Sequence, residues 1–402
     1  MKLHRTLVQA VISTLQQIFE QGQFADKAVE QVLKQNVRWG SRDRRFIAET
    51  VYEMVRWRRY FNEILAIRKN DNLADYYKLI AVKQLLDGEE LPDWPEFKEI
   101  DKTKLLEKAE IVKQTRKYKE SIPDWLDEIG SKELGEKIWG EELQALNSEA
   151  KVVLRVNELK TTRLQLQRLL GEQQVETWVM DDYPHALILQ RRQHLHQLAE
   201  YKQGLFEIQD ASSQLIAPFL DVKEGMQVID ACAGAGGKSL HLAAAMKNKG
   251  NILAMDVEER KLIELKKRSE RAGISIIKTQ TIQPDSIKKL SQTADRLLLD
   301  VPCSGLGVLR RNPDAKWKLN SDFLNKIKQT QQDILCNYAT MLKDQGIMVY
   351  ATCSILPSEN QDQVAEFLKK NKNAFELIED KKIMPSDGFD GFYMAKLKRV
   401  KA

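Results

Sequence analysis

Two cysteines occupy matching places in the sequence, and each is followed by a serine. Cys303 follows the apolar run 296–300, and Cys353 follows the apolar run 347–350. Both runs predict buried strands, and ligands of open α/β sheets bind outside the carboxyl ends of the strands. A thiolate is a good nucleophile, and a second thiol beside it can transfer protons. The pair therefore predicts covalent chemistry at a single reaction centre.

The alternative for any one cysteine is simple packing, because a cysteine after a strand is most often a small buried side chain. Two cysteines in two matching contexts favour reactivity instead. Cys336 lies beside apolar residues of a predicted helix and is assigned to the core. The four cysteines show no C-x-x-C spacing and the five histidines form no convincing cluster, so we expect no metal site.

The second chemical feature is a glycine-rich loop between a predicted strand and a predicted helix. It comprises Cys232, Ala233, Gly234, Ala235, Gly236, Gly237 and Lys238. Glycines let the backbone approach a ligand closely, and the following helix N-terminus offers unpaired N–H groups. A dinucleotide motif does not fit, because Ser239 stands where its third glycine belongs.

Three interpretations of this loop stay open. Gly237, Lys238 and Ser239 match the end of a phosphate-binding loop, which would make the protein an ATPase. Asp256 ends the next predicted strand, where a carboxylate would bind the ribose hydroxyls of S-adenosylmethionine. A tight turn without a ligand is the third interpretation.

A basic segment with an aromatic residue follows the first cysteine. It contains Arg310, Arg311, Lys316 and Trp317. This composition suits the RNA backbone and base stacking, so we predict RNA binding there. The alternative is an ordinary solvated loop.

The elements that position these residues form an α/β pattern after Gly225. Strands are predicted at 227–230, 251–256, 274–278, 296–300 and 346–352, and helices at 238–246, 258–271, 323–342 and 361–370. Residues 388–397 are expected to form a closing hairpin or edge strand. The alternation predicts a doubly wound, mostly parallel sheet.

The rest of the chain predicts two further modules. Residues 1–120 carry helical apolar periodicity and end in a highly charged segment, 101–119, interpreted as a linker or a long exposed helix. Residues 121–222 predict a small α+β module. Residues 223–402 form the doubly wound domain.

Length and composition agree with this division. The chain has 402 residues, a net charge of +5 and 43% apolar residues, which allows several cores and a polyanionic partner. Few cysteines and an N-terminus unlike a signal peptide or membrane span favour a soluble cytoplasmic protein. A monomer without a membrane partner is expected.

Several ordered motifs resemble the RsmB/Nop/Sun family of RNA cytosine-5 methyltransferases. The resembling segments are Asp230–Lys238, Leu299–Asp314 with Lys316 and Trp317, Tyr350–Asn360, Leu154–Asn157, Gln209–Gln214, and Asp387–Phe389 with Phe392 and Tyr393. The N-terminal helices resemble the NusB-like domain of bacterial RsmB more weakly. The resemblance implies a Rossmann-like class I methyltransferase domain, preceded by an all-α NusB-like bundle and an α+β module that contacts RNA.

The resemblance also implies the roles of the site residues. Cys353 is the nucleophile that attacks C6 of cytosine, and Cys303 helps the covalent adduct collapse. Asp300 contacts the cytosine edge and lies near the methyl donor, and Lys238 lies near the active-site charge. The glycine loop, Asp256 and Asp300 bind S-adenosylmethionine. The expected product is 5-methylcytosine in RNA, with 16S ribosomal RNA expected and transfer RNA possible.

Two departures from the family pattern bear on cofactor binding. The usual Ala-Ala-Pro-Gly-Gly-Lys is replaced by Ala233-Gly234-Ala235-Gly236-Gly237-Lys238, which lacks the proline. The acid expected after the third strand is missing, and Thr281 or a neighbour stands in its place. A ribosome-assembly RNA-binding factor that has lost catalysis therefore remains an alternative to the enzyme and to the ATPase.

Overall fold

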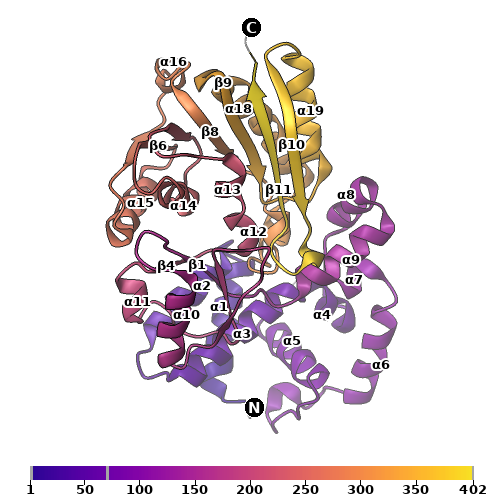
Figure 1. The fold of residues 1–402 in the computed structure, drawn as a ribbon. Helices are drawn as coiled ribbons and strands as arrows, with labels where there is room; N and C mark the ends of the chain where they lie inside the picture. The colour runs from indigo at the N-terminus through magenta and orange to yellow at the C-terminus, as the bar shows by residue number, and fades with distance from the viewer. Residues whose placement is uncertain (1–2, 69–71, 401–402) are drawn as a thin grey trace. The chain divides into compact units, whose positions relative to one another are not determined.

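The computed structural model describes residues 3–68 and 72–400 (Figure 1). The chain divides into two compact units. The helical unit comprises Met1–Ser148 and Leu309–Ser321, and the sheet unit comprises Glu149–Val308 and Asp322–Ala402. The predicted division at 120 and 222 stays a prediction, although helices of residues 124–147 pack within the helical unit rather than with the α+β module.

The helical unit is built on amphipathic helices around one apolar core. Its helices are α1 (Arg5–Phe19), α2 (Ala25–Gln35), α3 (Ser41–Arg56), α4 (Arg58–Leu65), α5 (Leu73–Leu86), η1 (Pro95–Phe97), α6 (Lys102–Val112), α7 (Arg116–Lys119), α8 (Asp124–Leu134), α9 (Glu136–Asn147) and α17 (Ala315–Lys318). Leu7, Val11 and Leu15 bury one stripe of α1, as the three-to-four-residue spacing predicts.

The charged segment 101–119 is not a linker. It forms α6 and α7, and Leu105, Ala109 and Val112 of α6 are buried in the core of the helical unit. The linker interpretation was wrong. The segment has few apolar residues, which suggested a linker, but their helical spacing places them on one face that packs against the core.

Residues 309–321 pack with the helical unit although both neighbouring segments belong to the sheet unit. The Trp317 indole N–H donates to the Val55 carbonyl at 2.7 Å, and the Asp314 carboxylate accepts from the Ala25 backbone N–H at 3.0 Å. The Lys318 ammonium donates to the Gln23 carbonyl at 2.7 Å. These bonds fix the segment on α2 and α3.

The sheet unit contains a small antiparallel sheet in the order β2-β3-β1-β4. Its elements are β1 (Val153–Val156), α10 (Arg163–Glu172), β2 (Thr177–Trp178), β3 (Ala186–Leu189), α11 (Ala199–Lys202) and β4 (Phe206–Ile208), followed by α12 (Ala211–Gln214) and α13 (Ile216–Leu220). Strands β1 and β3 are fully buried, which explains why their continuous apolar runs were visible in the sequence.

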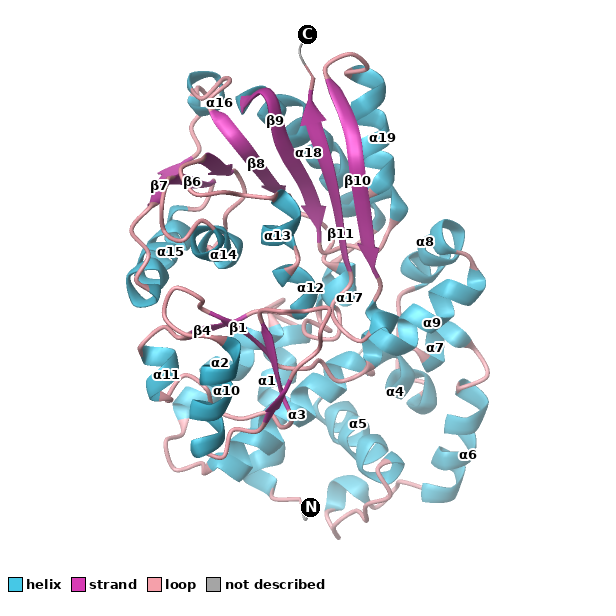
Figure 2. Cartoon of the chain, viewed as in Figure 1, coloured by secondary structure: helices cyan, strands magenta, loops and turns pink. Residues whose placement is uncertain are grey.

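The large sheet has seven strands in the order β10-β11-β9-β8-β5-β6-β7 (Figure 2). Its elements are β5 (Gln227–Asp230), α14 (Gly237–Ala245), β6 (Asn251–Asp256), α15 (Glu259–Ala272), β7 (Ile277–Thr281), α16 (Ser286–Lys289), β8 (Ala294–Asp300), η2 (Leu306–Val308), α18 (Ser321–Tyr338), η3 (Ala339–Met341), β9 (Leu342–Thr352), η4 (Pro357–Glu359), α19 (Gln361–Lys370), β10 (Phe375–Ile383), η5 (Pro385–Asp387) and β11 (Phe392–Arg399). Strands β5 to β9 pair in parallel, and β11 pairs antiparallel with β9 and β10.

The predicted fold class is confirmed: a mostly parallel, doubly wound sheet follows a helical region. The chain order reverses between β5 and its two neighbours, β8 and β6, which makes the carboxyl end of β5 the topological switch point where ligands bind. Within residues 3–68 and 72–400, every helix is too short or too polar to span a bilayer.

Candidate active site

The two predicted reactive thiols lie together. Cys303 follows β8 and Cys353 follows β9, and these strands are parallel neighbours in which Asp300 pairs with Ala351. The two Sγ atoms are 3.3 Å apart, and both side chains are half-buried. The geometry thus brings together, at one edge of the sheet, two groups that are fifty positions apart in the chain.

The electrostatics of the pair distinguish its members. The hydrogen bond with Cys353, burial and the charge of Glu359 hold the pKa of the Cys303 thiol well above its usual range. Cys303 therefore keeps its proton at neutral pH and can donate it toward the Cys353 sulfur. The arrangement suits Cys303 as the donor and Cys353 as the acceptor of the hydrogen bond between them.

Lys238 and Asp300 form an ion pair beside the thiols. The Nζ and Oδ2 atoms are 2.5 Å apart, and both side chains are largely buried. Burial alone would lower the pKa of Lys238. The Asp300 carboxylate, with smaller contributions from Cys353 and Asp230, raises this pKa above its usual value. Lys238 thus supplies a fixed positive charge to the site.

Glu359 is a buried residue to which the sequence analysis gave no role. Its carboxylate accepts hydrogen bonds from both serines that follow the cysteines, Ser304 and Ser354. Its side chain is 0% exposed. The only sequence signal was its place in the family motif 350–360.

The glycine loop lies at the switch point between β5 and α14. Gly234 and Gly236 have φ of +54° and +82°, a region where side chains are strained. A Cβ at Gly236 would also lie 2.3 Å from Leu265 Cγ. The side of Gly234 where a Cβ would stand is open space. The loop therefore combines an enforced turn with room for a ligand against its backbone.

The ribose-binding role of Asp256 stays a prediction, and the structure shows which groups its carboxylate binds. At the end of β6, Oδ2 accepts from the Gly234 N–H at 2.9 Å and Oδ1 accepts from the Glu258 N–H at 2.8 Å. Each carboxylate oxygen has a second lone-pair site, which remains for a ribose hydroxyl. The acid, the glycine loop and the switch-point position together fit S-adenosylmethionine.

Two arginines that sequence reasoning missed hold the loop from outside. Arg268 donates to the Ala235 carbonyl at 2.7 Å and is anchored by Glu207 at 2.9 Å. Arg155 donates to the Gly237 carbonyl and to Gln209. Burial lowers the pKa of Arg155 to about 9. These bonds restrain a loop that lacks the family's proline.

Two side chains at the loop, the Asp230 carboxyl and the Cys232 thiol, have pKa values above their usual ranges. Burial raises the pKa of Asp230 to about 7, although the Ser239 hydroxyl donates to it at 2.6 Å. Burial and the charges of Asp230, Asp300 and Asp256 hold the pKa of Cys232 well above its usual range. Cys232 thus has the character of a loop residue and not of a nucleophile.

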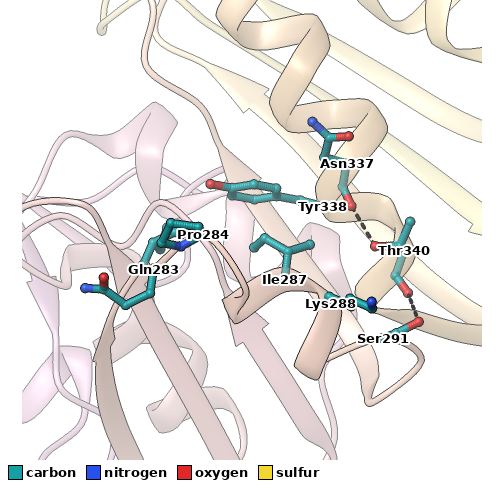
Figure 3. A pocket seen from close by; sticks show the side chains of 9 residues that line it. Gln283, Pro284, Ile287, Lys288, Ser291, Asn337, Tyr338 and Thr340 are labelled. Atoms are coloured by element: carbon teal, nitrogen blue, oxygen red, sulfur yellow. Dashed lines mark hydrogen bonds between the residues drawn. The ribbon is translucent and has the colours of Figure 1, made fainter.

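A pocket of about 730 Å³ opens beside the end of β7, between α16 and the end of α18 (Figure 3). Tyr338 extends across it toward Gln283 and Pro284 in the figure. Burial, with the nearby charge of Asp256, raises the pKa of Tyr338. Thr281 pairs with Asp256 in the β6–β7 register, so its place beside the acid is fixed; a cofactor contact by Thr281 stays a prediction.

The predicted RNA-binding segment is packed into the helical unit. Arg310 and Lys316 are 4% and 2% exposed, and the Arg310 carbonyl accepts from Arg56 at 2.9 Å. Burial and the charge of Arg56 hold the pKa of Lys316 well below its usual range. Trp317 is half-buried. RNA binding by Arg310, Arg311, Lys316 and Trp317 stays a prediction. Arg310 and Lys316 are buried and would have to become exposed to contact RNA.

Among the described residues, no three His, Cys, Asp or Glu side chains gather in a way that could hold a metal ion. The charged groups of the site pair with one another instead, as Lys238 and Asp300 do.

Comparison with known proteins identifies two matching family models. Residues 217–398 match the model described as 16S rRNA methyltransferase RsmB/F, and residues 122–196 match the ferredoxin-like domain of RsmF/B-like methyltransferases. A ribosomal RNA small subunit methyltransferase B of Pasteurella multocida is 34% identical over 72% of this chain and 68% of its own. One of Yersinia enterocolitica is 38% identical over 64% of this chain. The aligned region covers 62% of that relative's length, less than two thirds.

Solved structures agree in fold. The protein PH0851 aligns over 99% of both chains with a TM-score of 0.83 at 23% identity. NSun6 from Pyrococcus horikoshii, crystallised with the S-adenosylmethionine analogue SFG, aligns over 71% of this chain and all of its own, with a TM-score of 0.66 at 20% identity. A methyltransferase homologue from the same organism has a TM-score of 0.63 at 25% identity, over 71% of this chain and 98% of its own.

Proposed function

Because the chain belongs to the RsmB/F family of methyltransferases, we propose that it methylates C5 of a cytosine in RNA, with 16S ribosomal RNA as the substrate. The single observation that carries the proposal is the 3.3 Å separation of the Cys303 and Cys353 sulfurs beside the glycine loop. The proposal includes a cytoplasmic, monomeric enzyme.

S-adenosylmethionine is the cofactor of this family. When bound, it supplies an electrophilic methyl group. The residues that would hold it are those of the glycine loop, with Asp256 at the ribose and Asp300 on the side of the thiols. The open space at Gly234 and the free lone-pair sites of Asp256 support this assignment.

The target carbon needs activation, because C5 of cytosine is a poor nucleophile within its aromatic ring. The Cys353 thiolate forms a bond to C6, and the electrons of the C5–C6 double bond move toward C5. C5 then takes the methyl group. The Cys303 sulfur lies 3.3 Å from the Cys353 sulfur and the Lys238 ammonium interacts with Cys353, which supports Cys353 as the nucleophile.

The adduct must then lose the C5 proton. The proton passes to solvent water in a step that Cys303 promotes, the C5–C6 double bond re-forms, and Cys353 leaves as thiolate, so that one proton is released for each methyl group transferred. Asp300, which pairs with Lys238 at 2.5 Å, would accept a hydrogen bond from the cytosine amino group. The base must leave its stack to reach these groups, as in other enzymes that act on bases.

The proposal is tested with two variants and a matched control. Cys353→Ala is expected to abolish 5-methylcytosine formation in 16S RNA, and Cys303→Ala is expected to accumulate a protein–RNA adduct that survives denaturing electrophoresis. Cys336→Ala, which removes a half-buried thiol of α18, should retain activity. Unchanged methylation by Cys353→Ala would refute the nucleophile, and absence of an adduct with Cys303→Ala would refute its release role.

The two alternatives are separable from the proposal. Family membership leaves the ATPase interpretation of Gly237-Lys238-Ser239 without support, and calorimetry with ATP–Mg²⁺ and S-adenosylmethionine compares the two ligands directly. RNA binding without methyl transfer across 16S and transfer RNA would favour the assembly factor that has lost catalysis. Bisulfite sequencing of RNA from a deletion strain would identify the modified cytosine.

A further inference from the structure

Glu359 makes an unusually complete set of hydrogen bonds for a buried carboxylate. Oε1 accepts from the hydroxyls of Ser304 and Ser354, the latter at 2.5 Å. Oε2 accepts from the Ser304 backbone N–H at 2.8 Å and from the Gln331 amide at 3.0 Å. An ionised carboxylate has about four acceptor sites, and four donors occupy them here. The site is therefore matched to a carboxylate and leaves no place for an amide hydrogen.

The two turns that Glu359 joins are built alike. In each turn the serine directly follows a reactive cysteine, and its Oγ also accepts a backbone N–H two residues on, from Leu306 at 3.4 Å and from Leu356 at 3.2 Å. The two serine Oγ atoms are 3.3 Å apart, the same separation as the two Sγ atoms. Holding the serines together thus holds the thiols together.

Neighbouring bonds make Glu359 itself immobile. The Tyr350 hydroxyl donates to the Glu359 carbonyl at 2.7 Å. Asn360 donates to the Ser354 carbonyl at 3.0 Å and accepts from Thr352 at 2.5 Å. The Gln331 amide also donates to the Pro302 carbonyl at 3.0 Å, which ties the first turn to α18. A rigid acceptor between two turns is what fixed placement of side chains requires.

We infer that Glu359 is the positioning residue of the active site: by binding Ser304 and Ser354 with one carboxylate, it fixes the separation of the Cys303 and Cys353 sulfurs. Its consequence for methyl transfer rests on the function proposed above, whereas its consequence for the thiol separation does not. A buried glutamate that served only to stabilise the fold would affect folding but would leave the separation of the thiols in the folded protein unchanged.

The test replaces Glu359 with glutamine in the full-length protein. The amide has one acceptor oxygen and an NH₂ group with two donors. The NH₂ group would face at least one of the four present donors, and the hydrogen bond to that donor would be lost. Because a misplacement of about 1 Å can cost about 100-fold in rate, kcat is expected to fall about 100-fold with KM and cofactor affinity unchanged. Glu366→Gln, at an exposed position of α19, is the matched control and should behave as wild type.

A second readout is independent of methylation. Dibromobimane forms two thioether bonds with two adjacent thiols, releases two bromide ions, and becomes strongly fluorescent only when both thiols have reacted. Wild type and Glu366→Gln should be bridged between Cys303 and Cys353 rapidly, and Glu359→Gln at least several-fold more slowly. Peptide mapping identifies the bridged cysteines.

Serine variants keep the inference testable if Glu359→Gln does not fold. Ser354→Ala removes one donor and leaves the carboxylate with three, so the rate of bridging and kcat should fall in the same direction. In a Ser304→Ala, Ser354→Ala background, Glu359→Gln should add little further loss, because the three residues act as one unit. Additive losses would overturn the inference, as would wild-type bridging and kcat in Glu359→Gln. If wild type were bridged but did not methylate RNA, the proposed function alone would fail.

Discussion

Replacing Gly307 by alanine is expected to lower the methyl-transfer rate by displacing the turn that carries Cys353. Gly307 lies in η2, where its N–H donates to the Cys353 carbonyl at 2.9 Å and its carbonyl accepts from the Gly391 N–H at 2.8 Å. These two bonds join three segments of the sheet unit at the cysteine. An added methyl group therefore acts directly on the backbone of the nucleophile.

The size of the effect follows from the contacts that a Cβ would make. It would lie 2.2 Å from the Gly391 carbonyl oxygen and 2.8 Å from the Cys353 carbonyl oxygen, and real Cβ atoms essentially never approach closer than 3.0 Å. The Gly391 carbonyl must therefore move by at least 0.8 Å, the difference between 3.0 and 2.2 Å. Overpacking of this kind costs about 1–3 kcal/mol of stability. The Cys353 carbonyl oxygen must move by at least 0.2 Å, the difference between 3.0 and 2.8 Å, so the expected fall in kcat is smaller than the roughly 100-fold that a shift of about 1 Å at a reacting group costs.

The assay measures kcat with saturating RNA and S-adenosylmethionine, together with chemical denaturation. Gly171→Ala is the control, because Gly171 is an exposed residue of α10 with no atom near its Cβ position. Alanine there should be neutral or stabilising by up to about 1 kcal/mol. A Gly307→Ala protein with wild-type stability and wild-type kcat would show that the close backbone packing does not position Cys353.

Two further predictions concern the cofactor loop. Asp256→Ala removes the proposed ribose acceptor and two charge-assisted hydrogen bonds that shape the loop. Calorimetry should therefore show that S-adenosylmethionine binds about 10- to 100-fold more weakly. Glu264→Ala, on the exposed side of α15, is the control and should leave this affinity unchanged. Asp230 has its pKa raised by burial from 3.8 to about 7, so the folded state binds its proton more tightly and stability should fall as pH rises from about 4 to about 7. In Asp230→Asn, up to roughly 4 kcal/mol of this pH-dependent loss of unfolding free energy should disappear, as measured by denaturation at a series of pH values. An unchanged pH dependence would contradict a raised pKa for Asp230.

Much of the sheet unit could be predicted from the sequence because central strands such as β5 and β6 are largely buried. Strands β5 and β6 and helix α19 have the predicted bounds. Strand β7 begins three residues later than predicted, at Ile277. Strand β10 was not predicted at all, because its sequence FELIEDKKI is charged and its interior is exposed at the sheet edge. A strand that buries little leaves little apolar pattern to read.

The site was predictable where residue type alone indicates chemistry. The thiols, the glycine loop and Asp256 are of this kind, and the structure brings Cys303 within 3.3 Å of Cys353. Arg155, Arg268 and Glu359 were missed because their roles depend on which carbonyls or hydroxyls the fold brings to them. A single charged residue produces no periodic pattern in the sequence. Its hydrogen-bond partners come together only when the chain folds.

The assignment of residues 309–321 to the helical unit has a consequence for making pieces of this protein. The polypeptide leaves that unit after Ser148, returns to it at Leu309 and leaves again after Ser321. A fragment starting at residue 149 would therefore keep Trp317 and Asp314 while losing Val55 and Ala25, their hydrogen-bond partners. Cutting the gene at this boundary would expose the Trp317 ring, which packs on the core of the helical unit, so biochemical work is better done with the uncut polypeptide.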